Sequence, residues 1–347
     1  MTGSNLEAEI FNETHLGRMY RSKQRLRDRY ALYKLLGRGG FGVTFLARDT
    51  QLPGSPVCVI KQLCPKNQDD VTLSKARQRF EQEAKTLAQL GSHSQIPQLL
   101  DYFEIEGEFY LVQEYIHGRT LSQEIRRTGA WSEEEVKKFL QEFLPLLRYV
   151  HRRHVIHRDI KPSNILRCRD DGRLVLIDFG AVKEKFAIAE SKTIRSAIST
   201  HFVGTIGFSP PEQLAMRPVF ASDIYALGMT CLYLLSAKPP IEYEYEPLTG
   251  EVKWYNLVRV SDHFGRILDK MLKLTPRDRF KSADDVLRVL ELESYLETLK
   301  PCMSNHPLSA PVERSYQKPE FISPLMRTAI AIREWQARRD AKRRHEG

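Results

Sequence analysis

The chain has 347 residues, of which 41% are hydrophobic and 28% are charged, a composition typical of a folded globular protein with room for two lobes. No apolar run is long enough for a membrane-spanning helix, and the polar residues before position 15 do not resemble a secretory signal peptide. The five cysteines are odd in number and form no CxxC pair, so we expect reduced thiols in a cytoplasmic protein, not a disulfide framework or a zinc site.

The net charge of +9 is concentrated in two flanking arms. Residues 18–29 contain six Lys or Arg against one Asp, a local charge of +5, and residues 321–347 contain seven against three acidic residues, a local charge of +4. The rest of the chain sums to zero, which argues against a nucleic-acid-binding core. Peripheral membrane contact, a protein partner or contact with the rest of the chain all stay open for the arms, and the oligomeric state is not indicated.

Short strand-like runs follow a polar and basic leader, residues 1–29. The runs YALYKLL, VTFLARD, VCVIKQL and FYLVQE lie between positions 30 and 114 and are rich in β-branched and aromatic residues. One helix is expected among them, over 74–90. These elements predict a small antiparallel sheet with one helix, forming a lobe over residues 30–116.

Helical patterns dominate from Ser132 onward. Ser132 and Glu135 form a capping box, and apolar residues then recur at helical spacing up to Val150. Further helices are expected near 222–235, 263–273 and 282–290. A strand-rich lobe followed by a helical lobe, residues 117–292, predicts an α+β protein with a cleft between the lobes.

The last part of the chain is expected to be separate from these lobes. Pro and Ser become frequent after Lys300, so residues 293–322 are predicted to be a linker, and a basic helix is predicted over 323–347. Its apolar residues come first and its cations last, so we expect the apolar half to dock on the rest of the chain or on a partner. A solvated tail and contact with a membrane or nucleic acid stay open.

Gly37, Gly39 and Gly42 lie in LGRGGFGVTF, between two strand-like runs. A flexible hairpin turn would explain these glycines equally well. A dinucleotide-binding loop would be followed by a helix, whereas another strand follows here. At such a β-turn-β, bare backbone can approach phosphate groups closely.

Lys61 and Glu83 are expected to form a pair. Lys61 ends the strand VCVIK, and Glu83 lies in the apolar stripe of the helix over 74–90. A carboxylate in an inward-facing stripe is costly unless a cation pairs with it, and Lys61 is the obvious partner. The alternative is a strand-end lysine that reaches water.

The stretch HRDIKPSNIL, residues 157–166, places polar residues before a pair of apolar ones. Asp159 can accept the proton of an attacking hydroxyl group, Lys161 can neutralise a transferred phosphoryl group, and Asn164 offers an amide oxygen to Mg²⁺. Asp178, in DFG after LVLI, four apolar residues expected to form a buried strand, offers a second oxygen ligand. His157 is expected to be a structural imidazole in the core.

Together these motifs resemble those of the eukaryotic-like serine/threonine protein kinase family, and SDIYALGMTCLYLL is similar to its cyanobacterial members. The resemblance covers about residues 30–292, in the order and spacing of the family. The matching positions are Gly37, Gly39, Gly42, Lys61, Glu83, 157–164, 178–180, 204–205, 210–212, Asp223, Gly228 and Arg279. Lys161 is typical of the serine/threonine branch, and Glu212 is expected to pair with Arg279.

The resemblance implies a bilobal fold in which Mg²⁺ and ATP bind in the cleft. The residues implied for ATP binding are Gly37, Gly39, Gly40, Phe41, Gly42, Thr44, Val59, Lys61, Glu114, Ile116 and Leu166. The implied catalytic residues are Asp159, Lys161, Lys61 and Glu83, and the implied metal ligands are Asn164 and Asp178. Thr44 and Val59 replace the family's Val and Ala above the adenine, and Gln113 guards the back of that pocket.

The implied function is transfer of the γ-phosphoryl group of ATP to serine or threonine hydroxyls of protein substrates. Autophosphorylation at Thr193, Ser196, Ser199 or Thr200 would give Arg158 a phosphate to bind. Two alternatives stay open. One is a pseudokinase or nucleotide-binding scaffold, and the other is a small-molecule kinase of related fold.

Overall fold

The computed structural model describes residues 11, 13–38, 42–64, 70–181, 183–184 and 207–303. The chain divides into two units, Met1–Glu297 and Thr298–Gly347. The basic helix expected over 323–347, the candidate phosphorylation sites, and Gly39, Gly40 and Phe41 lie outside the described residues.

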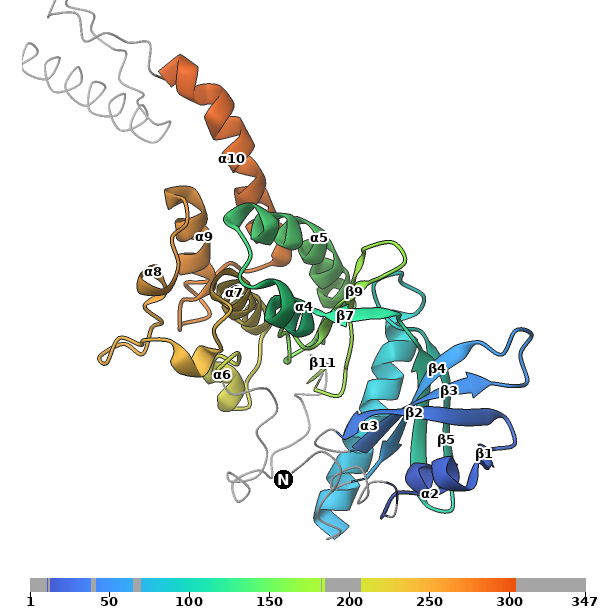
Figure 1. Cartoon of the computed structure of the whole chain (residues 1–347). Coiled ribbons are helices and arrows are strands. Elements are labelled where there is room, and N and C mark those ends of the chain that lie inside the picture. Colours follow the sequence, from blue (N-terminus) through green and yellow to red (C-terminus); the bar gives the residue numbers. More distant parts are fainter. Residues whose placement is uncertain are drawn as a thin grey trace, which may run out of the picture. The chain divides into compact units, whose positions relative to one another are not determined.

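A six-stranded antiparallel sheet forms the N-terminal lobe, in the order β1-β2-β3-β4-β6-β5 (Figure 1). Its strands are β1 (Arg25–Leu26), β2 (Tyr30–Arg38), β3 (Gly42–Asp49), β4 (Val57–Leu63), β5 (Leu99–Ile105) and β6 (Glu108–Glu114). Four of them coincide with the four runs expected from the sequence. The pattern did not indicate β5, because Asp101 and Glu104 interrupt its apolar residues.

Both faces of strand β6 are buried. Phe109 and Leu111 belong to the main core, to which helix α3 (Asp70–Leu90) also contributes. Tyr110 and Val112 belong to a second apolar cluster on the opposite face, because successive side chains of a strand alternate. The run FYLVQE is continuously apolar for this reason.

Helix α2 (His15–Ser22) lies in the segment that was expected to be a polar leader. The Thr14 side chain caps its N-terminus, and Leu16 is fully buried in the second cluster with Phe45 of β3. The Leu16 N–H also donates to Gln62 Oε1 at 2.8 Å. This part of the leader is therefore folded onto the sheet. The sequence did not indicate this, because the segment contains many basic residues.

The C-terminal lobe is helical, so the α+β fold expected from the sequence is confirmed (Figure 1). Its helices are α4 (Leu121–Thr128), α5 (Glu133–Arg152), α6 (Pro211–Leu214), α7 (Phe220–Ser236), η2 (Pro240–Glu242), α8 (Trp254–Leu257), α9 (Asp262–Met271) and α10 (Ala283–Met303). α5 begins at the expected capping box, in which Glu135 Oε2 accepts from Ser132 N at 2.8 Å. α10 continues past the helix expected near 282–290 and into the segment expected to be a linker.

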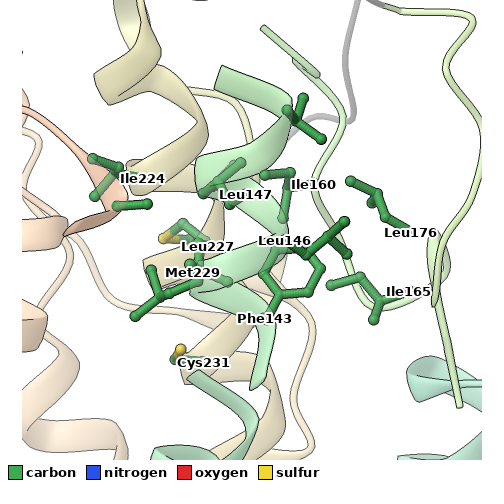
Figure 2. Close-up of a cluster of buried hydrophobic side chains, with 14 of the residues drawn as sticks. Phe143, Leu146, Leu147, Ile160, Ile165, Leu176, Ile224, Leu227, Met229 and Cys231 are labelled. Carbon is green, nitrogen blue, oxygen red and sulfur yellow. The ribbon is translucent and has the colours of Figure 1, made fainter. Parts of the chain in front are cut away.

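The stretch HRDIKPSNIL is anchored in the core by its apolar residues. Figure 2 shows α5 side chains between those of α7 and those of the stretch around Ile160 and Ile165. The side chains in this layer are Phe143, Leu146, Leu147, Leu227 and Met229, all fully buried. Ile160 and Ile165 are also fully buried, which fixes the position of the polar residues between them.

Two small sheets complete the C-terminal lobe. Strands β7 (Gly118–Thr120), β9 (Ile165–Cys168) and β10 (Leu174–Leu176) form a three-stranded sheet in the order β10-β9-β7, and β8 (Val155–Ile156) pairs with β11 (Lys183–Glu184). Of these strands the sequence indicated only β10, as the buried strand expected over LVLI. The others are too short to show a measurable period. Within the described ranges, no helix is both long and apolar enough to cross a bilayer.

Candidate active site

A cavity of about 620 Å³ lies between the sheet and the helical lobe. Nine residues expected at the site line it: Gly37, Thr44, Val59, Lys61, Glu114, Ile116, Asn164, Leu166 and Asp178. They come from β2, β3, β4, β6, β9 and the loops beside them, so segments far apart in the sequence converge on one cleft.

The cleft also has lining residues that the motifs did not single out. These are Leu36, Arg38, Pro97, Tyr115, Ser163 and Ile177. Tyr115 and Ile177 are direct neighbours of expected residues, so their position in the chain could have indicated them. Pro97, in the loop before β5, carries no such signal. Gln113, expected at the back of the pocket, lines it and is 7% exposed.

Gly42 is not among the lining residues, although it was expected to bind the nucleotide. A side chain at this position would place its Cβ 2.1 Å from the backbone oxygen of Gln62 on β4. The close approach of β3 to β4 therefore already requires a glycine here.

Lys61 of β4 and Glu83 of α3 form an ion pair, with 2.5 Å between Nζ and Oε1. Glu83 is only 5% exposed, and Lys61 Nζ also lies 3.7 Å from Asp178 Oδ1. Burial opposes the charge of the lysine, but the two carboxylates together raise the pKa of Lys61 above its ordinary value. Helix α3 thus holds a charged ammonium group at the wall of the cleft.

Asp178 follows β10 with a backbone φ of +67°, in the left-handed region that few non-glycine residues adopt. Its Oδ1 accepts from Gly180 N at 3.3 Å, and half of its side chain is exposed. Lys61 holds the pKa of Asp178 below its ordinary range. A Cβ on Gly180 would lie 3.2 Å from Glu83 Oε2, so the glycine allows this turn to lie close to α3.

Asp159, Lys161 and Asn164 are connected within the loop between β8 and β9. Lys161 Nζ lies 2.8 Å from Asp159 Oδ2. Asn164 Nδ2 donates to Asp159 O at 2.9 Å and to Asp159 Oδ2 at 2.8 Å. Because the amide nitrogen faces Asp159, the amide oxygen is directed away from it, and Asn164 lines the cleft.

His157 is a structural residue, as the sequence predicted. It is fully buried, and its ring packs edge-on against Phe179 with 4.9 Å between ring centroids. Its Nδ1 accepts from Asp159 N at 3.3 Å. Burial lowers the pKa of His157, which favours the neutral ring.

Asn164 and Asp178 fit a Mg²⁺ ion that also binds phosphate groups. Both offer hard oxygen atoms at the cleft, and Asp178 adds a negative charge. Among the described residues, no group of three or more His, Cys, Asp or Glu side chains could hold a metal by itself. An ion at this place would complete its shell with water and phosphate oxygens, as Mg²⁺ usually does.

The family model of the protein kinase domain matches residues 30–289. The chain belongs to the protein kinase family. Its curated relatives include serine/threonine-protein kinase B of Synechocystis sp., 50% identical over 287 residues, which are 82% of this chain and 50% of that one. Serine/threonine-protein kinase PknA of Nostoc sp. is 43% identical over 272 residues, which are 78% and 48% of the two chains. The resemblance to cyanobacterial members is thereby confirmed.

The chain spans about half the length of these curated relatives. Among solved structures, the kinase domain of Mycobacterium tuberculosis PknI is similar in fold, with a TM-score of 0.58 and 24% identity. The match covers 76% of this chain and 95% of the PknI chain.

In this kinase domain, Asp223 of α7 fixes the backbone before Asp159. It is fully buried and accepts from His157 N at 2.9 Å and from Arg158 N at 2.8 Å. Arg158 has a φ of +69°, so these bonds hold a strained backbone. Burial opposes the charge of Asp223, but the hydrogen bond from His151 Nε2, at 2.9 Å, and the other bonds keep its pKa below the ordinary range.

The side chain of Arg158 is buried without an ion-pair partner among the described residues. Arg158 is 7% exposed, and its Nε and Nη2 atoms have no hydrogen-bond partner among the described residues. Burial lowers the pKa of Arg158 to about 10, and the charge of Arg79 on α3 acts in the same direction. The sequence pattern around Arg158 does not indicate that this cation is buried.

Glu212 and Arg279 form the pair expected from the sequence. Arg279 Nη1 lies 2.6 Å from Glu212 Oε1, and Arg279 Nη2 lies 3.0 Å from Glu212 Oε2. The Ser222 hydroxyl also donates to Glu212 Oε1 at 2.7 Å. Because Arg279 is 2% exposed, this two-bond pair fixes α6 against the loop between α9 and α10 of the same lobe.

Proposed function

We propose that the chain is an active serine/threonine protein kinase that transfers the γ-phosphoryl group of Mg²⁺-ATP to hydroxyl groups of protein substrates. The observation that carries this proposal is the linked group of Asp159, Lys161 and Asn164. Asn164 lines the same cleft as Lys61, whose ammonium group is held by Glu83. Close relatives that are named serine/threonine kinases support the proposal.

The nucleotide is assigned to the cleft with its adenine between the two lobes. Thr44 and Val59 lie on the sheet side, and Leu166 lies on the helical side. The backbones of Glu114 and Ile116 supply hydrogen bonds to the adenine edge. The glycine loop would cover the phosphates through Gly37, Gly39, Gly40, Phe41 and Gly42.

In the proposed reaction, Lys61 orients the phosphate groups. Asp159 accepts the proton of the substrate hydroxyl as that oxygen attacks the γ-phosphorus atom and the bond to ADP breaks. Lys161 neutralises charge on the phosphoryl group during transfer. Mg²⁺, held by Asn164 and Asp178, would supply further charge neutralisation at the phosphates.

The test is phosphoryl transfer from radiolabelled ATP to a generic protein substrate. Asp159→Asn should lower turnover by about 100-fold or more, because it removes the proton acceptor. Asp28→Asn is a matched control, since Asp28 is exposed and its positive φ of 52° suits asparagine. Turnover near that of the wild type in folded Asp159→Asn would overturn the mechanism.

The same assay separates the two alternative functions. A pseudokinase or scaffold would bind ATP without labelling any substrate, and nothing in the geometry favours it, because the four polar catalytic positions are occupied. A small-molecule kinase would label a small hydroxyl compound but no protein.

We also propose a cytoplasmic location, supported by the unpaired state of the described cysteines Cys58, Cys64, Cys168 and Cys231. Part of the N-terminal basic arm is used within the fold. Arg29 lies 2.6 Å from Asp49, and Arg27 lies 3.0 Å from Asp101. Peripheral membrane contact is therefore better assigned to residues 321–347, which lie outside the described residues.

A further inference from the structure

A second cavity, of about 630 Å³, lies beside helix α4 and the three-stranded sheet of β7, β9 and β10. It is as large as the nucleotide cleft and shares no lining residue with it. Cavities of this size commonly hold small molecules. We call it the arginine cavity, because its lining includes Arg119, Arg127, Arg167 and Arg169.

The arginines are in excess over acidic groups. Glu124 is the one acidic lining residue, and its Oε2 already accepts from Arg167 Nε at 3.3 Å. The side chains of Arg119, Arg127 and Arg169 are exposed and form no ion pair or hydrogen bond with any described residue. Three positive charges therefore line one hollow without an ion-pair partner in the described part of the chain.

The strands bring two of these arginines together. Arg119 of β7 lies directly across from Arg167 of β9 in the antiparallel pair. Like charges at directly opposed positions destabilise a sheet. Glu124 and Glu142 lie within ion-pair distance of Arg167, whereas Arg119 has no acidic partner among the described residues, so an anion bound there would offset the charge of Arg119.

We propose that the arginine cavity binds a phosphorylated small molecule with at least two negative charges. The planar guanidinium group binds phosphate oxygens through paired N–H donors, and here such groups come from α4, from β7 and from β9 or the turn after it. A volume of about 630 Å³ suits a compact ligand better than an extended acidic peptide, which needs a long groove. The proposal does not depend on phosphoryl transfer by the chain.

The arginine cavity and the nucleotide cleft are close neighbours. Ile116 and Leu166 line the cleft, Cys168 lines the arginine cavity, and all three belong to one small apolar cluster. Phosphate compounds also fit the nucleotide cleft, so a binding experiment must fill that cleft first.

The test is isothermal titration calorimetry on the full chain saturated with Mg²⁺ and a non-hydrolysable ATP analogue. Fructose 1,6-bisphosphate is the probe, at fixed ionic strength, and unphosphorylated fructose is its control. We expect binding of the bisphosphate alone. The double variant Arg127→Gln/Arg169→Gln should bind the bisphosphate at least about tenfold more weakly, because two charge-assisted contacts are lost.

Arg126→Gln/Arg266→Gln is the matched variant. Both arginines are exposed, neither lines the cavity, and the change removes the same charge. This variant should bind the bisphosphate as the wild type does, and equal melting temperatures would show that both variants are folded. Equal weakening in both variants, or no binding by the wild type, would overturn the proposal. Tighter binding of a phosphoserine peptide than of the bisphosphate would also overturn it and assign the cavity to a phosphoprotein.

Discussion

Lys61 Nζ lies 2.5 Å from Glu83 Oε1, and Glu83 is 5% exposed. Lys61→Met therefore leaves a buried carboxylate without its cation, which should lower the free energy of unfolding by about 3 kcal/mol at neutral pH. We expect this variant to lose both phosphoryl transfer and stability in denaturant titrations, whereas Asp159→Asn should lose activity alone. Lys61→Met/Glu83→Leu should recover stability but not activity. An unchanged denaturation midpoint in Lys61→Met would contradict this account.

The stability of Lys61→Met should also depend on pH. Burial raises the pKa of Glu83, and Lys61 opposes that rise, so its removal leaves a more strongly raised pKa in the folded chain. Such a group contributes stability below its unfolded pKa, about 4.3, and loses it as pH rises through the folded pKa. The loss in free energy of unfolding of Lys61→Met, relative to the wild type, should therefore be larger at pH 8 than at pH 5. A deficit independent of pH would indicate lost packing instead of an unpaired charge.

At the level of single residues, sequence reasoning found contacts that follow from one local pattern. A carboxylate in the apolar stripe of α3 needs a cation, so the partner of Glu83 could be predicted. The further contact between Lys61 and Asp178 could not, because it depends on how the turn after β10 folds back toward β4. The burial of Arg158 was missed for the same reason, since it depends on neighbours from other elements.

The buried, unpartnered side chain of Arg158 supports activation by phosphorylation. We expect mass spectrometry of active wild-type enzyme to find phosphate on Thr193, Ser196, Ser199 or Thr200. Arg158→Met should be at least as stable as the unphosphorylated wild type, because it removes a buried charge, but phosphorylation should no longer activate it. Fully active wild-type enzyme without phosphate in this segment would contradict the prediction.

Among the elements, helix α2 depends most clearly on tertiary contacts, because an eight-residue helix is marginal by itself. Leu16 is fully buried against the sheet, so Leu16→Ala should lower the free energy of unfolding by about 3 kcal/mol. Arg21→Ala, at an exposed position of the same helix, should change it by less than about 0.5 kcal/mol. Nucleotide affinity should not change in either variant, because Leu16 packs on the face away from the cleft. Equal stability of the two variants would show that α2 does not support the lobe.

Elements with a long and regular pattern were predictable, and most short ones were not. Strands β2, β3, β4 and β6 and helices α5, α7 and α9 all lie where alternation or helical spacing indicated them. Strands β7 and β9 have only three or four residues each, too few to show a period, whereas β10 lies in the apolar run LVLI that was expected to be a buried strand. Strands β7 and β9 supply lining residues of the arginine cavity, so that cavity could not be foreseen from the sequence.

For the whole molecule, the sequence supplied the order of the motifs but not the surface they form together. The cleft joins β2, β3 and β4 to the loops around β9 and β10, and its members are known as neighbours only because the family fold brings them together. Pro97 shows the limit of this reasoning, since no motif marks it and only the folded loop before β5 places it at the cleft. The motifs therefore predicted the chemistry of the site more fully than its lining.

The basic segment at the end of the chain permits a test at this largest scale. Every residue that lines the nucleotide cleft lies within Met1–Glu297, so truncation after Glu320 should leave Mg²⁺-ATP affinity unchanged. The segment 321–347 carries a charge of +4 and an apolar stretch that starts at Leu325, and we propose that it docks. Truncation removes this contact, so the truncated chain should melt at a lower temperature or lose a partner. Calorimetry, kinase assays and affinity capture with both chains measure these effects. Identical melting temperature, activity and captured proteins would show that the segment does not dock.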